Sequence, residues 1–414
     1  MTAANGEGLM TRIFGVILAA IVATVTITQA FGCADTGSAR SRAAEDVYVA
    51  PGEHDKYYAF LSGGQSGSVF VVGIPSGRLI REIPVFEPRA AYGYAVHPND
   101  PRRRQLEETG GAWGDTHHPA ISETNGEYDG QFLFINDKAN PRLAVIDLRD
   151  FETKQIVVNP IFKSEHGGAF VSPNTDYIIE AAQYAAPLEN KKFFPLEEFN
   201  EKYRGGVTYW KFDRKEGRIN AKESFSLELP PYSQDLSDFG KGPSDGWSFT
   251  NSFCSERYVG GIEKGRPPYE AGCSAKDTDY LHVINWKKAA EVVKAGKAKK
   301  INGHNVIMME TAIKEGLLFL VPEPKSPHGV DVTPDGKFMV VAGKLDTHVS
   351  VYSFEKIQAA ITAGKFESKD PYGIPVIGMK DALHVQVPLG LGPLHTQYDS
   401  KACVAYTSLY VDSQ

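Results

Sequence analysis

The sequence contains little cysteine: only Cys33, Cys254, Cys273 and Cys403 occur among its 414 residues. No two of them form a C-x-x-C pair, which excludes zinc ribbons, thioredoxin-like sites and c-type haem attachment. Cys254 and Cys273 could form a disulfide in an oxidising compartment, and the sequence leaves this pairing open. Cysteine is therefore not expected to supply the main ligands of any site.

The sequence also has no excess of positive charge. The formal net charge is -7 and the sequence pI is about 5.9. This balance excludes a general nucleic-acid-binding protein, which would need a basic face. The two basic clusters, residues 102–104 and the lysines between Lys287 and Lys300, lie among polar residues and are predicted to be solvated surface.

One long apolar run stands out near the N-terminus, from Ile13 to Ala30. It follows Arg12 and is succeeded by Phe31-Gly32-Cys33, a pattern typical of a secretory signal. We expect residues 1–33 to be a signal peptide or a membrane anchor, with Cys33 as a candidate site of lipid attachment. The segment has no twin-arginine pair, which favours general secretion and predicts a periplasmic location.

Helical patterns are few. They cover roughly residues 287–298 and 354–363, and they look like insertions between strands instead of the regular alternation of an α/β fold. From Tyr57 onward, short runs rich in β-branched and aromatic residues are separated by Gly, Pro, Asn and Asp. This pattern predicts an all-β fold.

Three stretches share one hairpin design, and each begins with a histidine. They start at His166, His328 and His395, and the second contains the turn Pro334-Asp335-Gly336, in which Pro presets the turn angle and Gly supplies a positive φ. Degenerate hairpin repeats of this kind are typical of β-propeller blades. We predict a β-propeller over residues 45–414, with the polar stretches 185–206 and 230–246 as loops that decorate one face.

The histidines that begin these repeats are the candidate site. Equivalent positions at one end of the innermost strands converge on the axis of a propeller, so His166, His328 and His395 are expected to lie together. A further blade supplies the adjacent pair His117 and His118. Five imidazoles cannot satisfy one another as neutral donors and acceptors, and they would repel if charged, whereas a metal resolves both problems.

So many ligands exceed what one ion usually takes, which predicts a multinuclear centre. Asp115, two residues before His117, is a candidate acceptor for a ring N–H and would fix a tautomer. The other histidines lie outside the repeat position and are predicted to be surface or packing residues: His54, His97, His282, His304, His348 and His384.

At these residues the chain resembles the nitrous oxide reductase family. The shared motifs are Gly-Asp-Thr-His117-His118-Pro, Glu165-His166-Gly-Gly, Ser-Pro-His328-Gly, Gly-Pro-Leu-His395-Thr, Phe134-Ile135-Asn136-Asp137, Gly343-Lys344-Leu345 and Val411-Asp412-Ser413-Gln414. The similarity runs from about residue 50 to the end of the chain.

The resemblance implies a seven-bladed propeller that holds a four-copper, sulfide-bridged cluster and reduces N2O to N2 and water, the last step of denitrification. Seven histidines hold the cluster in the family, and five match residues of this chain: His117, His118, His166, His328 and His395. The other two would lie beyond Gln414, as would a C-terminal cupredoxin domain with a dinuclear copper centre. The chain is therefore expected to be an incomplete propeller and inactive alone.

The resemblance also implies partners and a second kind of metal. Electrons would come from a c-type cytochrome or a cupredoxin and would cross a head-to-tail homodimer. Calcium is expected near the cluster, and Glu256 and Asp279 match two of its carboxylate ligands. Phe253 stands where the family has tyrosine, and Ser326 where it has asparagine, so the calcium site departs from the family pattern.

Two alternatives remain open on the sequence. An exported propeller hydrolase, such as a lactonase with a single metal in its channel, would need carboxylates at the repeat position that carries histidine here. A propeller scaffold that binds a partner on one face would need no metal at all.

Overall fold

The computed structural model describes residues 43–88, 97, 99–111, 113–189, 192–253, 255, 279–324 and 326–414. The predicted signal segment, residues 1–33, and the predicted Cys254–Cys273 pair lie outside these residues. None of the helices in the described part of the chain is long and apolar enough to cross a membrane. Cys403 is a free, exposed thiol.

The chain divides into two compact units. The first comprises Met1–Ala59 and Val72–Ile80, and the second comprises Phe60–Val71 and Arg81–Gln414. Strands β1 (Tyr57–Ser62), β2 (Ser68–Ile74) and β3 (Leu79–Pro84) belong partly to each unit. The blades and the candidate site described below all belong to the second unit.

One blade of the second unit is a four-stranded antiparallel sheet in chain order. Its strands are β4 (Thr116–Thr124), β5 (Glu127–Asp137), β6 (Arg142–Asp147) and β7 (Glu152–Val158). Helix α3 (Pro101–Glu108) precedes it and begins after Asp100, whose side chain accepts the N–H of Arg102 at 2.9 Å. Every residue of β6 is buried, because the middle of a blade is covered on both faces.

The next blade is built on β8 (Phe170–Val171), β9 (Tyr177–Ala181), β10 (Gly205–Asp213) and β12 (Phe225–Leu229). Its outer edge is extended by β17 (His304–Ile307) and β16 (Lys299–Ile301), and β11 (Arg218–Ile219) pairs with β10. The short helices η2 (Leu196–Glu198) and α4 (Phe199–Lys202) connect β9 to β10.

A further blade contains β13 (Ser233–Phe239), β14 (Ser248–Phe253), β15 (Asp279–Ile284) and β18 (Leu318–Glu323). Strands β23 (Pro375–Val376) and β22 (Ser368–Lys369) extend its outer edge. The connections include η3 (Gly242–Ser244), α7 (Trp286–Lys294) and α8 (Met309–Lys314).

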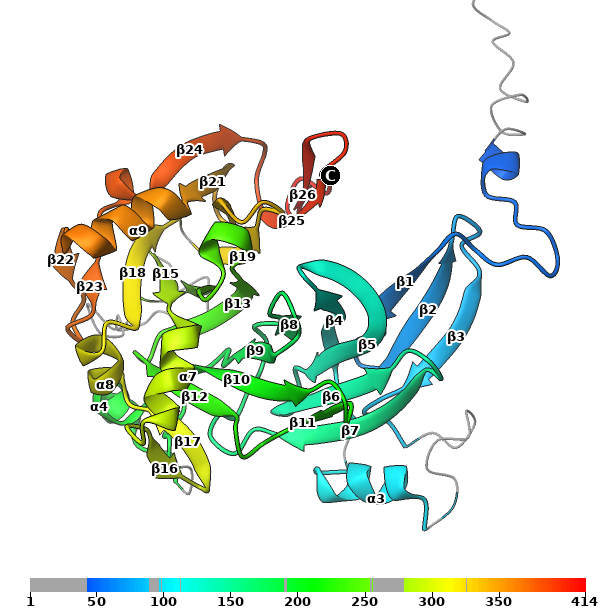
Figure 1. The fold of residues 1–414 in the computed structure, drawn as a ribbon, viewed down its shortest axis with the longest axis horizontal. Helices are drawn as coiled ribbons and strands as arrows, with labels where there is room; N and C mark the ends of the chain where they lie inside the picture. The colour runs from blue at the N-terminus through cyan, green and yellow to red at the C-terminus, as the bar shows by residue number, and fades with distance from the viewer. Residues whose placement is uncertain are drawn as a thin grey trace, which may run out of the picture. The chain divides into compact units, whose positions relative to one another are not determined.

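The last four-stranded blade has the order β19 (Pro327–Val332), β20 (Phe338–Gly343), β21 (His348–Ser353) and β24 (Leu383–Pro388). Helix α9 (Phe354–Ala363) and the 3-10 turn η4 (Met379–Asp381) lie between β21 and β24. The hairpin β25 (Pro393–Asp399) and β26 (Val404–Leu409) follows. In Figure 1, β4, β8, β13, β19 and β25 are the innermost strands, grouped around one axis.

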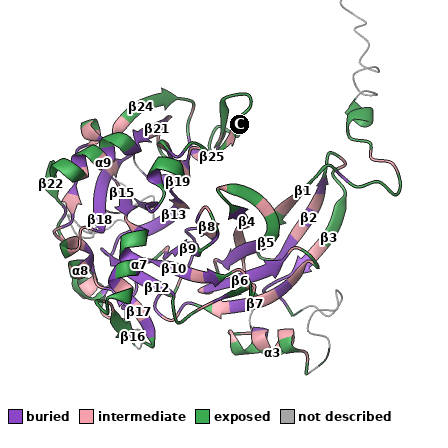
Figure 2. Ribbon diagram, in the orientation of Figure 1, coloured by how far each residue is buried: buried purple, intermediate pink, exposed green. Residues whose placement is uncertain are grey.

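Apolar side chains hold neighbouring blades together. Phe134 and Val145 of one blade form a buried cluster with Ile178 and Trp210 of the next. Similar clusters join the later blades, and Figure 2 shows β10, β13 and β15 largely buried while the outward faces of α7 and α9 are exposed. The aromatic and β-branched residues that suggest strands in the sequence therefore also form the contacts between blades.

The structure confirms the all-β propeller fold predicted from the sequence. Helices α7 and α9 occupy the two predicted helical stretches. The prediction that residues 230–246 form only a loop is wrong, because they contain β13, the innermost strand of its blade. Asp and Ser are rare in strands, and the burial of β13 comes from packing against neighbouring blades, which local propensity does not show.

Candidate metal centre

The residues that face the axis sit at irregularities of the innermost strands. The pairing register shifts between His117 and Ala120 in β4, between Gln234 and Ser237 in β13, between Pro327 and Val330 in β19, and between Pro393 and Thr396 in β25. Each interval contains one residue of the site: His118, Asp235, His328 or His395. Because an extra residue in a strand redirects the neighbouring side chains, these bulges allow all four side chains to point inward.

The structure brings the five predicted histidines together. The ring centroids of His117 and His118 are 4.4 Å apart, and each lies 5.0 Å from the centroid of His166. The ring of His328 lies 5.7 Å from that of His166 and 5.0 Å from that of His395. The ring centroids of His118 and His395 are 5.4 Å apart, so each of the five rings has at least one neighbour in the group.

Three of these rings present nitrogen atoms close enough to share a metal. One ligand atom from each of His117, His118 and His166 lies within 4.8 Å of the others. The Nε2 atoms of His118 and His166 are 3.3 Å apart. His118 has a positive φ of 42°, an unusual backbone conformation for a non-glycine residue that turns this ring toward His166.

Burial keeps the imidazoles neutral. Burial, together with the neighbouring imidazoles, lowers the pKa of His117 and of His395 to about 4. Burial likewise lowers the pKa of His118, well below its usual value, and the pKa of His166. A neutral imidazole carries the lone pair that a metal needs, so these four rings are in their ligand form at neutral pH.

Asp235 of β13 is the orienting residue that sequence reasoning missed. Its Oδ1 lies 2.7 Å from Nδ1 of His166, and its Oδ2 accepts a hydrogen bond from Nδ1 of His328 at 2.7 Å. Burial opposes ionisation of this carboxyl, but His328 and His166 hold its pKa well below the usual value. A carboxylate on Nδ1 leaves Nε2 of both rings available for a metal.

The predicted orienting role of Asp115 is not seen in the described residues. Its backbone N–H donates to Asp137 at 2.8 Å, and its carboxylate makes no hydrogen bond to an imidazole among them. Asp235 occupies that role instead. Asp235 lies near the start of an inner strand, as His328 does in β19, but only the observed pairing of β13 with β14 shows this, because no local sequence pattern marks β13 as a strand.

Lys344 follows β20 and lies beside Asp235. Its Nζ is 3.5 Å from Asp235 Oδ2 and 5.5 Å from the centre of the Phe253 ring. The backbone N–H of Lys344 donates to Ser326 at 2.9 Å. The site therefore contains one cation next to its buried carboxylate.

Of the two predicted calcium ligands, Glu256 lies outside the described residues. Asp279 is buried and accepts three hydrogen bonds, from Ser255 N at 3.0 Å, Ser255 Oγ at 2.6 Å and Ser326 N at 2.9 Å. It is the direct strand partner of Glu323, also buried, which the sequence did not single out. Burial raises the pKa of Glu323 well above its usual value.

The remaining histidines do not join the cluster. His282 and His304 are buried, and His304 Nε2 lies 3.0 Å from Ser226 Oγ. His54, His97 and His384 are exposed, and His348 is partly exposed beside Asp346. Their positions agree with surface and packing roles.

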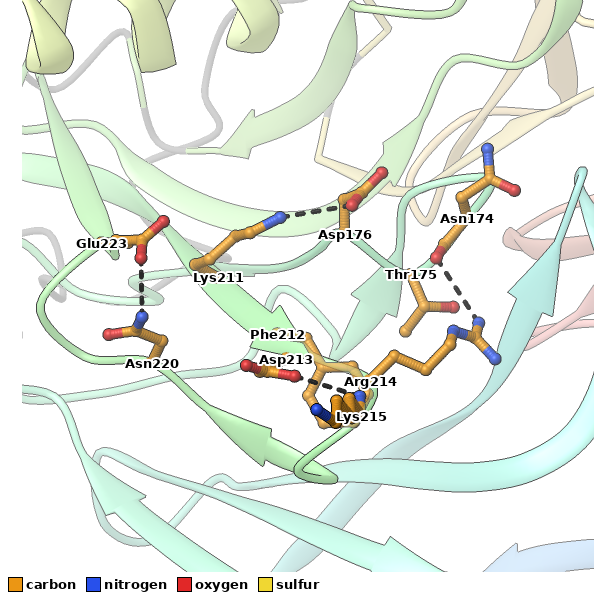
Figure 3. A pocket seen from close by; sticks show the side chains of 10 residues that line it. All are labelled: Asn174, Thr175, Asp176, Lys211, Phe212, Asp213, Arg214, Lys215, Asn220 and Glu223. Carbon is orange, nitrogen blue, oxygen red and sulfur yellow. Dashed lines mark hydrogen bonds and ion pairs between the residues drawn. The ribbon is translucent and has the colours of Figure 1, made fainter.

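A surface pocket is formed by the turns of the blade built on β8, and Figure 3 shows its lining. Lys211 pairs with Asp176 at 3.2 Å, Asn220 donates to Glu223 at 2.8 Å, and Arg214 donates to the Asn174 carbonyl at 3.4 Å. None of the five clustered histidines lines it.

Comparison with known proteins agrees with this geometry. The sequence is 31% identical over 409 residues to nitrous-oxide reductase of Pseudomonas fluorescens, and 32% identical over 417 residues to that of Stutzerimonas stutzeri. The alignments cover 97% and 98% of this chain. The chain is related to nitrous-oxide reductase.

The chain spans 59% and 60% of the length of these two reductases. No protein-family model matches the sequence. Among solved structures, hydrazine synthase of Kuenenia stuttgartiensis is similar with a TM-score of 0.52 and 14% identity, covering 86% of this chain and 78% of that one. At this identity the match supports the propeller fold alone.

Proposed function

We propose that the chain forms the copper-binding propeller of a nitrous-oxide reductase, with His117, His118, His166, His328 and His395 as ligands of a multinuclear centre. The observation that carries the proposal is the meeting of five imidazoles, from strands and turns far apart in sequence, in one group of buried and partly buried rings. The relationship to nitrous-oxide reductases supports copper as the metal.

The donor set fits copper. Imidazole nitrogen is a favoured ligand of copper, and five imidazoles exceed the usual demand of a single ion. Asp235 is bonded to Nδ1 of His328 and lies 2.7 Å from Nδ1 of His166, which leaves Nε2 of both rings available for the metal. The lowered pKa values of His117 and His395 mean that copper need not displace a proton from these rings at neutral pH.

The proposed reaction is N2O + 2H+ + 2e- → N2 + H2O, in which the bond between nitrogen and oxygen breaks and oxygen leaves as water. Copper would supply the electrons and the binding site for the linear substrate. The protein's own contribution is to bind and orient the metal through the imidazoles and to exclude water. Phe170, whose ring centroid is 6.3 Å from that of His118, is an apolar neighbour of the site.

Calcium near the centre is also part of the proposal. Asp279 and Glu323 stand directly opposite each other in neighbouring strands, and both are buried. The side-chain oxygen Oδ1 of buried Asn251 has no hydrogen-bond partner, although its Nδ2 donates to Glu323 at 2.8 Å. Two buried carboxyl groups that face each other and an unsatisfied carbonyl oxygen are reasons to place a hard cation here, because Ca2+ prefers such oxygen ligands.

The proposal also covers the location, the electron donor and the assembly of the enzyme. We propose a periplasmic enzyme that takes electrons from a c-type cytochrome or cupredoxin and works as a homodimer. This part rests on the resemblance described above, because the relatives are longer than the chain.

Copper stoichiometry tests the proposal. The full chain, expressed in the periplasm and loaded with copper, is compared with His118→Ala/His328→Ala and with a matched double variant of exposed or outlying histidines, His97→Ala/His384→Ala. We expect at least about two copper ions per chain in the wild type and in the control, because five imidazoles exceed one ion's needs. Fewer ions, or the same copper content in His118→Ala/His328→Ala, would refute the multinuclear centre.

A further inference from the structure

Asp331 of β19 is tied to the segment that carries His395. Its Oδ2 accepts a hydrogen bond from the backbone N–H of Thr396 at 2.7 Å. Thr396 is the residue directly after His395, and it is almost completely buried. The Asp331 side chain therefore fixes the peptide group that joins His395 to Thr396.

A second bond reinforces the same junction. The hydroxyl of Tyr398, two residues further along β25, donates to the backbone carbonyl of Asp331 at 2.7 Å. Thr396 and Tyr398 thus both bond to Asp331, one to its side chain and one to its backbone. Strand β25 is therefore held against β19 at Thr396 and at Tyr398.

The two strands also touch directly beside the histidines. Gly329, which follows His328, has a φ of 111°, and a Cβ at this position would overlap the carbonyl oxygen of Leu394, the residue before His395. The close approach of these backbones sets the 5.0 Å distance between the rings of His328 and His395. Glycine is required here both for space and for the positive φ.

Asp238 makes a similar bond one blade earlier. Its Oδ2 accepts the N–H of Val332 at 2.9 Å, which ties β13 to β19. Val332 lies four residues beyond His328, whereas Thr396 is the immediate neighbour of His395. Of these two carboxylates, that of Asp331 bonds to the immediate neighbour of a clustered histidine, and that of Asp238 does not.

We propose that Asp331 is a positioning residue that sets the orientation of the His395 ring for metal binding. The inference rests on the proposed function, since it assigns Asp331 a role in the copper site. Without the carboxylate, the Thr396 N–H loses its acceptor in a buried place, and the peptide next to His395 is free to rotate. The ring then no longer points at the shared metal position.

The copper test uses Asp331→Leu, which removes the acceptor at similar size, and Asp331→Asn, which keeps a carbonyl oxygen for the Thr396 N–H. Asp331→Leu should weaken copper retention in chelator competition by about tenfold or more, as loss of a ligand's supporting bond does. Asp331→Asn should restore most of it. Asp238→Leu removes the same kind of acceptor, but the N–H that it serves is four residues from His328. It should therefore weaken copper retention less than Asp331→Leu does.

A double-mutant cycle separates positioning from general destabilisation. If Asp331 acts through His395, Asp331→Leu should add nothing when His395→Ala is already present. Equal losses of copper affinity from Asp331→Leu in the two backgrounds, or no rescue by Asp331→Asn, would overturn the inference.

A metal-free measurement keeps this result distinct from the copper proposal. With isotope-labelled histidine, NMR spectra of the apo chain should show the His395 ring signals shifted or broadened by Asp331→Leu, with those of His117 unchanged. That outcome would support positioning even if the wild type bound no copper, in which case the proposed function alone fails. Unchanged His395 signals in Asp331→Leu would refute the positioning role.

Discussion

The carboxylate of Asp235 bridges two imidazoles, with one oxygen 2.7 Å from Nδ1 of His166 and the other 2.7 Å from Nδ1 of His328. This single residue of β13 therefore couples histidines that belong to two other blades. Its position on a strand between theirs explains how it reaches both. The orientation of two of the five rings depends on it.

Replacing Asp235 should weaken metal binding. In Asp235→Asn one carboxylate oxygen becomes an NH2 group, which cannot accept a ring N–H, so one imidazole loses its fixed tautomer. We expect copper affinity to fall by about 10-fold to 100-fold in chelator competition. Asp399→Asn, an exposed acid at the end of β25, is the control. Equal affinities for the two variants would contradict the role of Asp235.

The buried histidines should make the metal-free chain sensitive to acid. The folded-state pKa of His117 and of His395 is about 4, below the usual 6.5. The folded state then binds fewer protons than the unfolded state between these values, so stability is lost as pH falls from 6.5 toward 4. Each ring contributes at most about 3 kcal/mol to this loss.

Urea unfolding at several pH values measures the effect. The slope of stability against pH between about 4 and 6.5 should be smaller in His117→Gln and in His395→Gln than in the wild type. Parallel profiles for all three proteins would show that these rings titrate normally.

Glu123 should have the opposite pH dependence. Burial raises its pKa from 4.5 to about 7, although Lys241 at 2.9 Å counteracts this. The folded state binds more protons than the unfolded state between pH 4.5 and 7, so stability falls as pH rises through this range. The contribution is up to about 3 kcal/mol.

Glu123→Gln removes this group while keeping its size. The difference in unfolding free energy between variant and wild type should move in favour of the variant from pH 4.5 to 7 and stay constant above. A difference that does not change with pH would contradict the raised pKa of Glu123.

Gly329, which lies in β19 at the contact with β25, should not tolerate substitution. Gly329→Ala places a methyl group against the Leu394 carbonyl, so β19 and β25 must separate. Gly364, at the end of α9, also has a positive φ, 63°, but open space around it. Gly364→Ala should cost only about 1 kcal/mol.

Gly329→Ala should cost more in denaturant unfolding and should also lower copper retention. If both alanine variants were equally stable and retained copper equally, the strand contact would not be needed for the site.

An exposed apolar strand should promote self-association of the chain. Strand β24 pairs only with β21 among the described strands, and Val385 and Val387 are 43% and 37% exposed on it. Exposed edges with apolar side chains are sites of strand pairing between molecules. Val385→Thr/Val387→Thr should shift sedimentation profiles toward monomer, whereas Val340→Thr, buried in the same blade, should not. Unchanged association in the first variant would rule out this edge.

The sequence predicts the parts of the site that are marked locally. Pro334-Asp335-Gly336 predicts the turn between β19 and β20, and the histidines follow from their repeat position. Asp235 could not be identified in this way, because β13 is rich in Ser, Asp and Gln and looks like a loop. Glu323 was missed for a related reason: its meeting with Asp279 depends on the register of β15 and β18, which no local pattern fixes.

X-ray absorption at the copper edge of the loaded chain tests the central claim most directly. We expect imidazole nitrogen scattering at about 2 Å and a second copper close to the first, since the five rings lie close together. In His118→Ala/His328→Ala the copper–copper signal should disappear. A spectrum of isolated copper without a copper neighbour, unchanged in the variant, would contradict the multinuclear histidine centre.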